Sequence, residues 1–574
     1  MKVTVNSSSK IQRKLVFWNR RFGDGRSAAL RIFTTGIDTM KRIALFATAV
    51  TLFNLIASSQ EPSAKLAVFV SIDQMKAEHL ERYKNEFTGG FKRMLSQGTV
   101  YTNADLNFAP SETGPGHATL GTGCYPWKSG ILANDWIDPK TGKNVYCVED
   151  STAEKAELEG GGMSPRNLVV TGIGDWLKQS SPSSKVIAVS VKDRAAILMG
   201  GQGPDYAFWY DRKTGRMVTS EHYTRTIPQW VKSFNSGNWI DRNVPAAWTK
   251  LRSEEVYSKY GPDELEGEMK WDGSTSFPHM FQPSIKREQI ITSPYGDKMV
   301  LDFAREAVRA EQLGQRGVQD ILCVSLSCTD YIGHAFGSNS HEIIDQMLRL
   351  DLELGAFIEW LEKTVGRGSV VVALSADHAA MPLPEYTTTV DKKFSRRISP
   401  KTQINPGIEE LNRTLQKELK TTEHVIQSNA FLNYSAARKA NVDSIALEQR
   451  IRKEVLAIDG FVDIYFRREL LDPSTPDRPY LGTFRRGYFA GRGKDFVVRF
   501  CENCLVTSSS TGSSHGSPYS YDTRVPIVFW GMGIKHLSVD RSVNTVDIAP
   551  TLARMLGAPF PASIDGKPLR EIAK

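Results

Sequence analysis

The chain has 574 residues, of which 40% are hydrophobic and 24% are charged, an ordinary globular composition that excludes wholesale disorder. Its net charge of +8 lies entirely in the first 60 residues, which hold ten Lys/Arg and two Asp/Glu, while the remainder carries 62 residues of each sign. The basic balance therefore gives no reason to expect a nucleic-acid partner.

An apolar stretch near the amino terminus has the pattern of a secretory signal peptide at about residues 40–60. Met40-Lys41-Arg42 precede the run IALFATAVTLFNLIA (43–57), and small polar residues follow it. The run is short for a membrane anchor. We therefore expect a leader at residues 1–60 and an exported protein, periplasmic or secreted, that meets the membrane only during export. Residues 1–39 would precede the signal, as they would if a start codon were assigned too far upstream.

From about residue 64 the chain alternates strand and helix patterns. Short apolar runs rich in Val and Ile predict buried parallel strands, and amphipathic helices are expected at 297–313 and 342–365. This alternation predicts an α/β fold: a doubly wound, mostly parallel central sheet with helices on both faces. The predicted strands are LAVFVSI (66–72), KVIAVSV (185–191), ILCVSLS (321–327) and SVVVALS (369–375).

Two segments do not follow this alternation, and we expect them to be insertions in a single domain at 64–574. Residues at about 206–290 are irregular and rich in Trp, Tyr and charge. Residues at about 385–500 read as a small α/β subdomain with helices near 409–420 and 443–458. RVPIVFWG (524–531) then returns to the sheet.

The six cysteines fit an exported protein without proving any disulfide. Cys501 and Cys504 form a CxxC pattern, and Cys124 and Cys147 could pair across a loop. The pairing stays open at the level of the sequence.

Three of the predicted strands run into metal-binding side chains. Asp73 follows the first, Asp330 and His334 follow the third, and Asp377-His378 follow the fourth. Ligands of parallel sheets gather beyond the carboxyl ends of the strands, and zinc accepts carboxylate and imidazole donors. One Asp at such a place could be a turn residue or a helix N-cap. Three of them, two with a His, predict a two-metal hydrolytic site.

The loop at 110–136 places Thr113 just ahead of a Gly/Pro-containing helix start. Alone, Thr113 would read as an N-cap residue. A hydroxyl at a helix start can also use the backbone N–H groups to hold an anion, and metals beside it can activate it as a nucleophile. Two predicted metals nearby favour this second interpretation.

An ordered series of motifs resembles the alkaline phosphatase superfamily, most closely the phosphate-irrepressible alkaline phosphatases of the PafA type, which are exported bacterial monoesterases. The resemblance spans about residues 64–570. Its markers, in chain order, are SIDQM, SETGPGHATLGTGCYP, ANDW, SVKDR, TDYIGHAFG, LSADHAA, SSHGSPYSYDTRVPIVFWG and TVDIAPTLARMLG.

The resemblance implies two Zn²⁺ per subunit and a substrate pocket built from residues far apart in the chain. One zinc would be bound by Asp330, His334 and His515. The other would be bound by Asp73, Asp377 and His378 together with Thr113. The phosphoryl oxygens would be held by Asn134, Lys192 and Arg194. His117, in the nucleophile loop, is expected to pack or hydrogen-bond structurally.

The reaction implied is hydrolysis of small-molecule phosphate monoesters through a phosphothreonine at Thr113. The alternative is a phosphodiesterase or nucleotide pyrophosphatase of the same superfamily, which would share the metal ligands. In that case aromatic residues of 206–290 could contact the second substituent. A non-catalytic metal-binding protein and a phosphotransferase are further alternatives. The natural substrate and the oligomeric state, with a monomer as one option, are left open.

Overall fold

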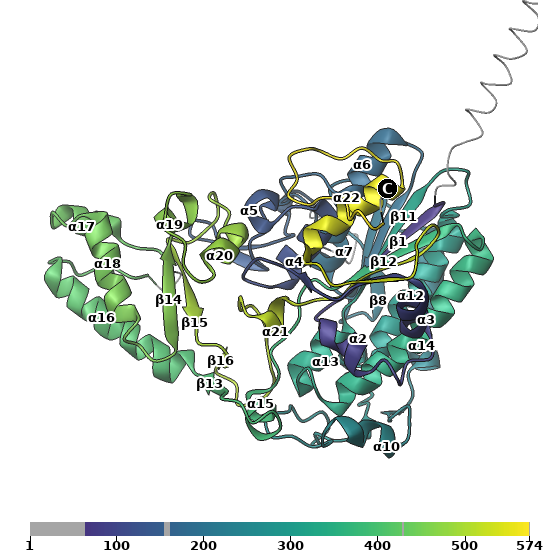
Figure 1. Cartoon of the computed structure of the whole chain (residues 1–574), viewed down its shortest axis with the longest axis horizontal. Helices are drawn as coiled ribbons and strands as arrows, with labels where there is room; N and C mark the ends of the chain where they lie inside the picture. The colour runs from purple at the N-terminus through teal and green to yellow at the C-terminus, as the bar shows by residue number, and fades with distance from the viewer. Residues whose placement is uncertain (1–63, 154–160, 428–429, 573–574) are drawn as a thin grey trace, which may run out of the picture. The chain divides into compact units, whose positions relative to one another are not determined.

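The computed structural model describes residues 64–153, 161–427 and 430–572, which belong to one compact unit (Figure 1). The expected signal sequence at about 40–60 lies outside these residues. Within the described ranges, no helix combines the length and the apolar character needed to span a membrane.

The described residues build a central sheet of nine strands. The five strands β12, β1, β11, β6 and β7 are consecutive neighbours and run parallel, whereas β17 and β8 are antiparallel to the strands beside them. This arrangement confirms the predicted fold class. In spatial order the strands are β18 (Leu537–Val539), β2 (Thr99–Tyr101), β17 (Ile527–Gly531), β12 (Val370–Ser375), β1 (Leu66–Ile72), β11 (Asp320–Leu326), β6 (Val186–Ser190), β7 (Tyr206–Asp211) and β8 (Arg216–Val218).

Helices cover both faces of this sheet because its strands are apolar on both sides. Along β1, Leu66, Val68, Val70 and Ile72 join one hydrophobic cluster, while Ala67 and Phe69 join the other. The first cluster is completed by α3 (Gly90–Gln97), α12 (Pro294–Glu311) and α14 (His341–Val365). The second is completed by α4 (Thr113–Thr122), α6 (Ile173–Ser180), α7 (Asp193–Gly200) and α22 (Ile548–Met555) (Figure 1).

The two segments expected to be insertions differ in how they relate to the sheet. The segment at about 206–290 starts with β7 and β8, which are strands of the central sheet. Much of the segment at about 385–500 has a hydrophobic core of its own. That core is formed by α16 (Asn405–Glu418), α17 (Tyr434–Lys439), α18 (Ser444–Val455), β14 (Phe461–Phe466) and β15 (Phe496–Phe500).

Cys501 and Cys504 form a disulfide that follows β15 directly. Cys124 and Cys147, which could have paired on sequence grounds, are buried free thiols in this structure. A CxxC turn brings its two sulfurs together locally, whereas a long-range pair depends on tertiary packing.

The parallel strands end at the same edge of the sheet and so bring distant residues together. Ile72 of β1 is in register with Leu326 of β11, and Ser71 is in register with Ser375 of β12. The residues that follow these three strands therefore meet beyond one edge of the sheet, where ligands bind in open α/β folds.

Candidate active site

Six side chains from this edge form two groups, each able to hold a metal ion. In each group the candidate ligand atoms lie within 4.8 Å of one another. All six are residues that the sequence predicted as metal ligands, and their metal-binding roles stay predictions. One group is Asp73, Asp377 and His378, and the other is Asp330, His334 and His515.

The group around Asp73 has the chemistry of a metal site. Oδ1 of Asp73 and Nε2 of His378 are buried without a hydrogen-bond partner among the described residues, whereas Oδ2 of Asp73 faces Nζ of Lys192 and Oδ2 of Asp377 faces Nδ1 of His117. Buried polar atoms are normally satisfied, and leaving one unsatisfied costs about 1–3 kcal/mol. A divalent cation would satisfy both unpartnered atoms at once, so these residues fit such an ion.

The three histidines are held in the tautomer that a metal ligand needs. Nδ1 of His334 lies 2.8 Å from the carbonyl of Ser513, and Nδ1 of His378 lies 3.0 Å from that of Ala379. Nδ1 of His515 lies 2.6 Å from the carbonyl oxygen of Ser111. Because a carbonyl only accepts, each Nδ1 carries a proton, which leaves Nε2 as the nitrogen that could bind a metal.

Helix α13 (Cys328–Phe336) explains how Asp330 and His334 come together. Residues four apart lie on the same face of a helix, and Nε2 of His334 lies 3.2 Å from Oδ1 of Asp330. His515 comes from a loop after β16 (Cys504–Val506) and places Nε2 3.7 Å from the same oxygen. Only the fold brings His515 to this position.

Lys192 joins the two metal groups to the expected nucleophile. Its Nζ lies 2.8 Å from Oδ2 of Asp73, 2.5 Å from Oδ2 of Asp330 and 3.3 Å from Oγ1 of Thr113. Nη2 of Arg194 lies 3.4 Å from the same Thr113 oxygen. The hydroxyl of Thr113 therefore faces two cations that follow β6, the buried Lys192 and the half-buried Arg194.

Thr113 is the first residue of α4, whose start is fixed by Asn134. The backbone N–H of Gly114 donates to Oδ1 of Asn134 at 2.7 Å, and the N–H of Asn134 donates to Oε2 of Glu112 at 2.7 Å. Thr113 itself is 1% exposed. A buried hydroxyl at a helix start, beside cations, suits the binding of an anion.

Burial and charge set the protonation of these groups. Burial lowers the pKa of His378 to about 4, so its imidazole is neutral. Burial alone would lower the pKa of Lys192, but Asp330 and Asp73 outweigh it and hold that pKa above its ordinary value. Burial and the neighbouring Asp377 raise the pKa of Asp73. Burial also lowers the pKa of His515, whereas Asp330 outweighs burial at His334 and raises its pKa. The site thus combines neutral imidazoles at His378 and His515 with the ammonium ion of Lys192.

The sequence did not single out Gln74, which connects the two metal groups. Its side-chain N–H donates to Oδ1 of Asp330 at 2.7 Å and its backbone N–H donates to Oδ1 of Asp377 at 3.1 Å. Its backbone has a φ of 67°, which turns the chain sharply after β1. Its place next to Asp73 was the one signal available in the sequence.

His117 lies behind the site and contacts both α4 and a metal-ligand candidate. Nδ1 is 3.0 Å from the carbonyl oxygen of Thr113 and 3.2 Å from Oδ2 of Asp377, and Nε2 is 2.9 Å from Oγ of Ser325. These are the structural hydrogen bonds that the sequence led us to expect for His117.

Comparisons with known proteins identify relatives along most of the chain. The pattern of the family "Type I phosphodiesterase / nucleotide pyrophosphatase" matches residues 67–399. Alkaline phosphatase PhoV of Synechococcus elongatus is 33% identical over 89% of this chain and 93% of its own length. Alkaline phosphatase PafA of Elizabethkingia meningoseptica is 33% identical over 89% of this chain and 95% of its own.

A solved structure of PafA superposes with a TM-score of 0.82 at 31% identity, covering 90% of this chain and 100% of that one. A solved variant of PafA carries substitutions at a threonine, an asparagine, a lysine and an arginine, the last two separated by a single residue.

The fold and the site define a hydrolase of the alkaline phosphatase superfamily. The chain belongs to the type I phosphodiesterase / nucleotide pyrophosphatase family within it, as the sequence resemblance predicted. Its relatives place it among the phosphoric monoester hydrolases.

Proposed function

We propose that this hydrolase cleaves small-molecule phosphate monoesters at a two-zinc site, through a phosphothreonine formed on Thr113. One observation carries the proposal: Nζ of Lys192 contacts Thr113, Asp73 and Asp330 together. One ammonium group thus links the nucleophile candidate to candidate ligands of both metal groups. PafA, a relative named as an alkaline phosphatase, has been solved as a variant at the residue types of Thr113, Asn134, Lys192 and Arg194, with the same lysine–arginine spacing.

In the proposed reaction Oγ1 of Thr113 attacks phosphorus while the bond from phosphorus to the leaving oxygen breaks. Water then attacks the phosphothreonine and regenerates the Thr113 hydroxyl. Lys192 and Arg194 offset the charge on the non-bridging oxygens, with the guanidinium able to grip two of them. Bound zinc ions would supply positive charge that stabilises the attacking and leaving oxygens.

The arrangement around Thr113 orients the nucleophile before substrate arrives. The hydrogen bond from Gly114 N–H to Asn134 fixes the first turn of α4, and both cations already point at Oγ1. Holding reacting groups in place removes part of the entropic barrier. The side-chain oxygen of Asn134 accepts the hydrogen bond from Gly114, so the side-chain NH₂ group can donate to a phosphoryl oxygen.

The phosphodiesterase alternative rests on the family pattern, and one feature of the structure argues against it. Several of the aromatic residues expected to contact a second substituent are packed into the hydrophobic core: Phe208 and Trp248 are 0% exposed and Trp209 is 6% exposed. The rings of these three residues are therefore not available to a diester. Two cations beside Thr113 suit the dianionic end of a monoester better.

The test compares Thr113→Ala with Thr113→Ser in the zinc-loaded protein. We expect Thr113→Ala to lose nearly all turnover of an aryl phosphate monoester with zinc content unchanged. Thr113→Ser should keep measurable turnover because it keeps a hydroxyl. Acid quenching during turnover should trap phosphate on residue 113 of the wild-type protein and of Thr113→Ser. It should trap none on residue 113 of Thr113→Ala, which has no hydroxyl. Full activity of Thr113→Ala would refute the nucleophile assignment.

Substrate preference gives an independent test. We expect kcat/KM to be much higher for the monoester than for the matching diester, and Lys192→Ala or Arg194→Ala to reduce monoester turnover more than diester turnover. Equal losses on both substrates would remove the physical reason for preferring the monoesterase.

We also propose that the protein is exported. The basic and apolar segment at about 40–60 supports this proposal, and so does the Cys501–Cys504 disulfide, because such bonds persist in oxidising compartments. Zinc identity is proposed from the mixture of carboxylate and imidazole donors. Metal analysis of the purified protein tests the zinc, and recovery of the protein outside the cytoplasm after cell fractionation tests export.

A further inference from the structure

Arg212 lies at the same edge of the sheet as Lys192 but has no role in the site described above. β7 runs parallel to β6, with Trp209 in register with Ser190. Lys192 follows the end of β6, and Arg212 directly follows Asp211 at the end of β7. Neighbouring parallel strands therefore deliver both cations beyond the same carboxyl edge.

The ring of Tyr331 links the two cations. Nζ of Lys192 lies 5.1 Å from the centre of this ring, and Cζ of Arg212 lies 6.0 Å from it. Tyr331 is the residue after Asp330 on α13. Arg212 is exposed, whereas Lys192 is buried. Positively charged side chains therefore lie on both sides of Tyr331: Lys192 in the buried site and Arg212 at the solvent.

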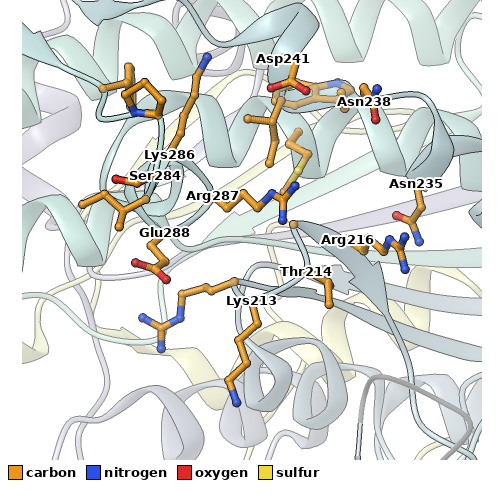
Figure 2. A pocket seen from close by; sticks show the side chains of 18 of the residues that line it. Lys213, Thr214, Arg216, Asn235, Asn238, Asp241, Ser284, Lys286, Arg287 and Glu288 are labelled. Carbon is orange, nitrogen blue, oxygen red and sulfur yellow. The ribbon is translucent and has the colours of Figure 1, made fainter.

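A hollow of about 800 Å³ is lined in part by Arg212. Its lining includes five cationic and two acidic side chains, so the net charge favours an anion. Figure 2 shows Arg287 in the middle of this hollow, close to the turn that carries Thr214. Lys286 points away from that turn and donates to the carbonyl of Val244 at 2.7 Å.

We propose that Arg212 binds an anionic substituent on the leaving group while Lys192 and Arg194 hold the phosphoryl group that is transferred. The proposal rests on the monoesterase function proposed above and narrows its substrates to phosphate esters whose leaving group carries a negative charge of its own. Arg212 is then a specificity residue, because its guanidinium meets the part of the substrate that does not react.

The test uses pairs of aryl phosphates that differ only in the charge of one substituent. The probes are 3- and 4-carboxyphenyl phosphate, each compared with its carboxamide. For each isomer the measured quantity is the ratio of kcat/KM for the carboxylate to kcat/KM for the carboxamide. For at least one isomer we expect this ratio to be roughly tenfold lower in Arg212→Ala than in wild type. That is the size of one charge-assisted hydrogen bond at a partly exposed site. Turnover of the carboxamide should change by less than about twofold.

Two further variants separate a direct contact from a general field. Arg212→Lys keeps the charge and should retain most of the preference. Lys232→Ala removes one exposed cation from α8 (Gln229–Ser236), outside the hollow, and should leave the ratio unchanged. An unchanged ratio in Arg212→Ala for both isomers, or an equal fall in Lys232→Ala, would overturn the proposal. The Thr113→Ala result is independent of this ratio, so the two proposals can fail separately.

Discussion

Gly116 is the point at which helix α4 rests on the residues that follow β12, among them the candidate metal ligand Asp377. A Cβ at residue 116 would lie 2.3 Å from the carbonyl oxygen of Asp377 and 2.7 Å from its Cβ. Real Cβ atoms essentially never approach closer than 3.0 Å. Gly116→Ala must therefore move either α4, which carries Thr113, or Asp377, a candidate metal ligand.

The structure allows the size of the effect to be worked out. Overpacking of a tight contact typically costs about 1–3 kcal/mol, and replacing a helical Gly with Ala returns about 0.5–1 kcal/mol. The net loss of stability should therefore be about 1–2 kcal/mol. A shift of reacting groups by roughly 1 Å can lower the rate by about 100-fold. We expect Gly116→Ala to lose far more activity than stability.

The assay combines kcat/KM on an aryl phosphate, bound metal per chain, and urea unfolding. Gly482→Ala is the matched control: Gly482 also lies in a helix, α20 (Leu481–Gly487), but its Cβ would meet nothing closer than 3.4 Å. This control should retain activity and gain slight stability. Gly114→Ala, with contacts at 3.1 Å to Asn134 and Cys147, should fall between the two. Wild-type activity and metal content in Gly116→Ala would refute the reasoning.

Two further predictions concern pH and metal. Burial lowers the pKa of His79 to about 4, and its Nε2–H donates to the carbonyl of Ser338 at 3.0 Å. As the pH falls, the imidazole takes up its proton at about pH 6.5 in the unfolded chain but only at about pH 4 in the folded protein. The stability that depends on neutral His79 is therefore fully present above about pH 6.5 and is lost as the pH falls toward 4. His79→Gln keeps a hydrogen-bond donor but does not titrate. Between about pH 7.5 and pH 5, its unfolding free energy should therefore fall by about 2 kcal/mol less than that of wild type. An equal effect from His536→Gln, at an exposed histidine, would contradict this prediction. Removing metal with a chelator should lower the midpoint of thermal unfolding. Zinc at about 1,000 times its Kd should then restore about 4 kcal/mol of unfolding free energy. An unchanged midpoint would argue against a metal in either group.

The sheet could be predicted because its strands have a simple pattern. Val- and Ile-rich runs separated by amphipathic helices define parallel strands whose ends share an edge. The predicted run at 66–72 is β1, and the predicted helix at 342–365 coincides with α14 apart from His341. The weak point was the segment at about 206–290, because β7 has the aromatic sequence YAFWYD in place of a Val/Ile-rich run and β8 has only three residues.

The sequence by itself determined which residue types stand at the ends of the central strands. Asp73, Asp330 and Asp377 follow buried strands, and that position depends only on local pattern and on the common edge of parallel strands. The α13 pair, Asp330 and His334, is likewise local, because one helical turn brings both side chains to one face.

Only the tertiary structure decided which distant groups touch. The strand order put β7 beside β6 and so placed Arg212 near Lys192, and the chain turn after β1 put Gln74 between the two metal groups. The close contact of Gly116 with Asp377 also joins segments far apart in the chain. Such contacts depend on how whole elements pack in three dimensions, and no local pattern of residues encodes that packing.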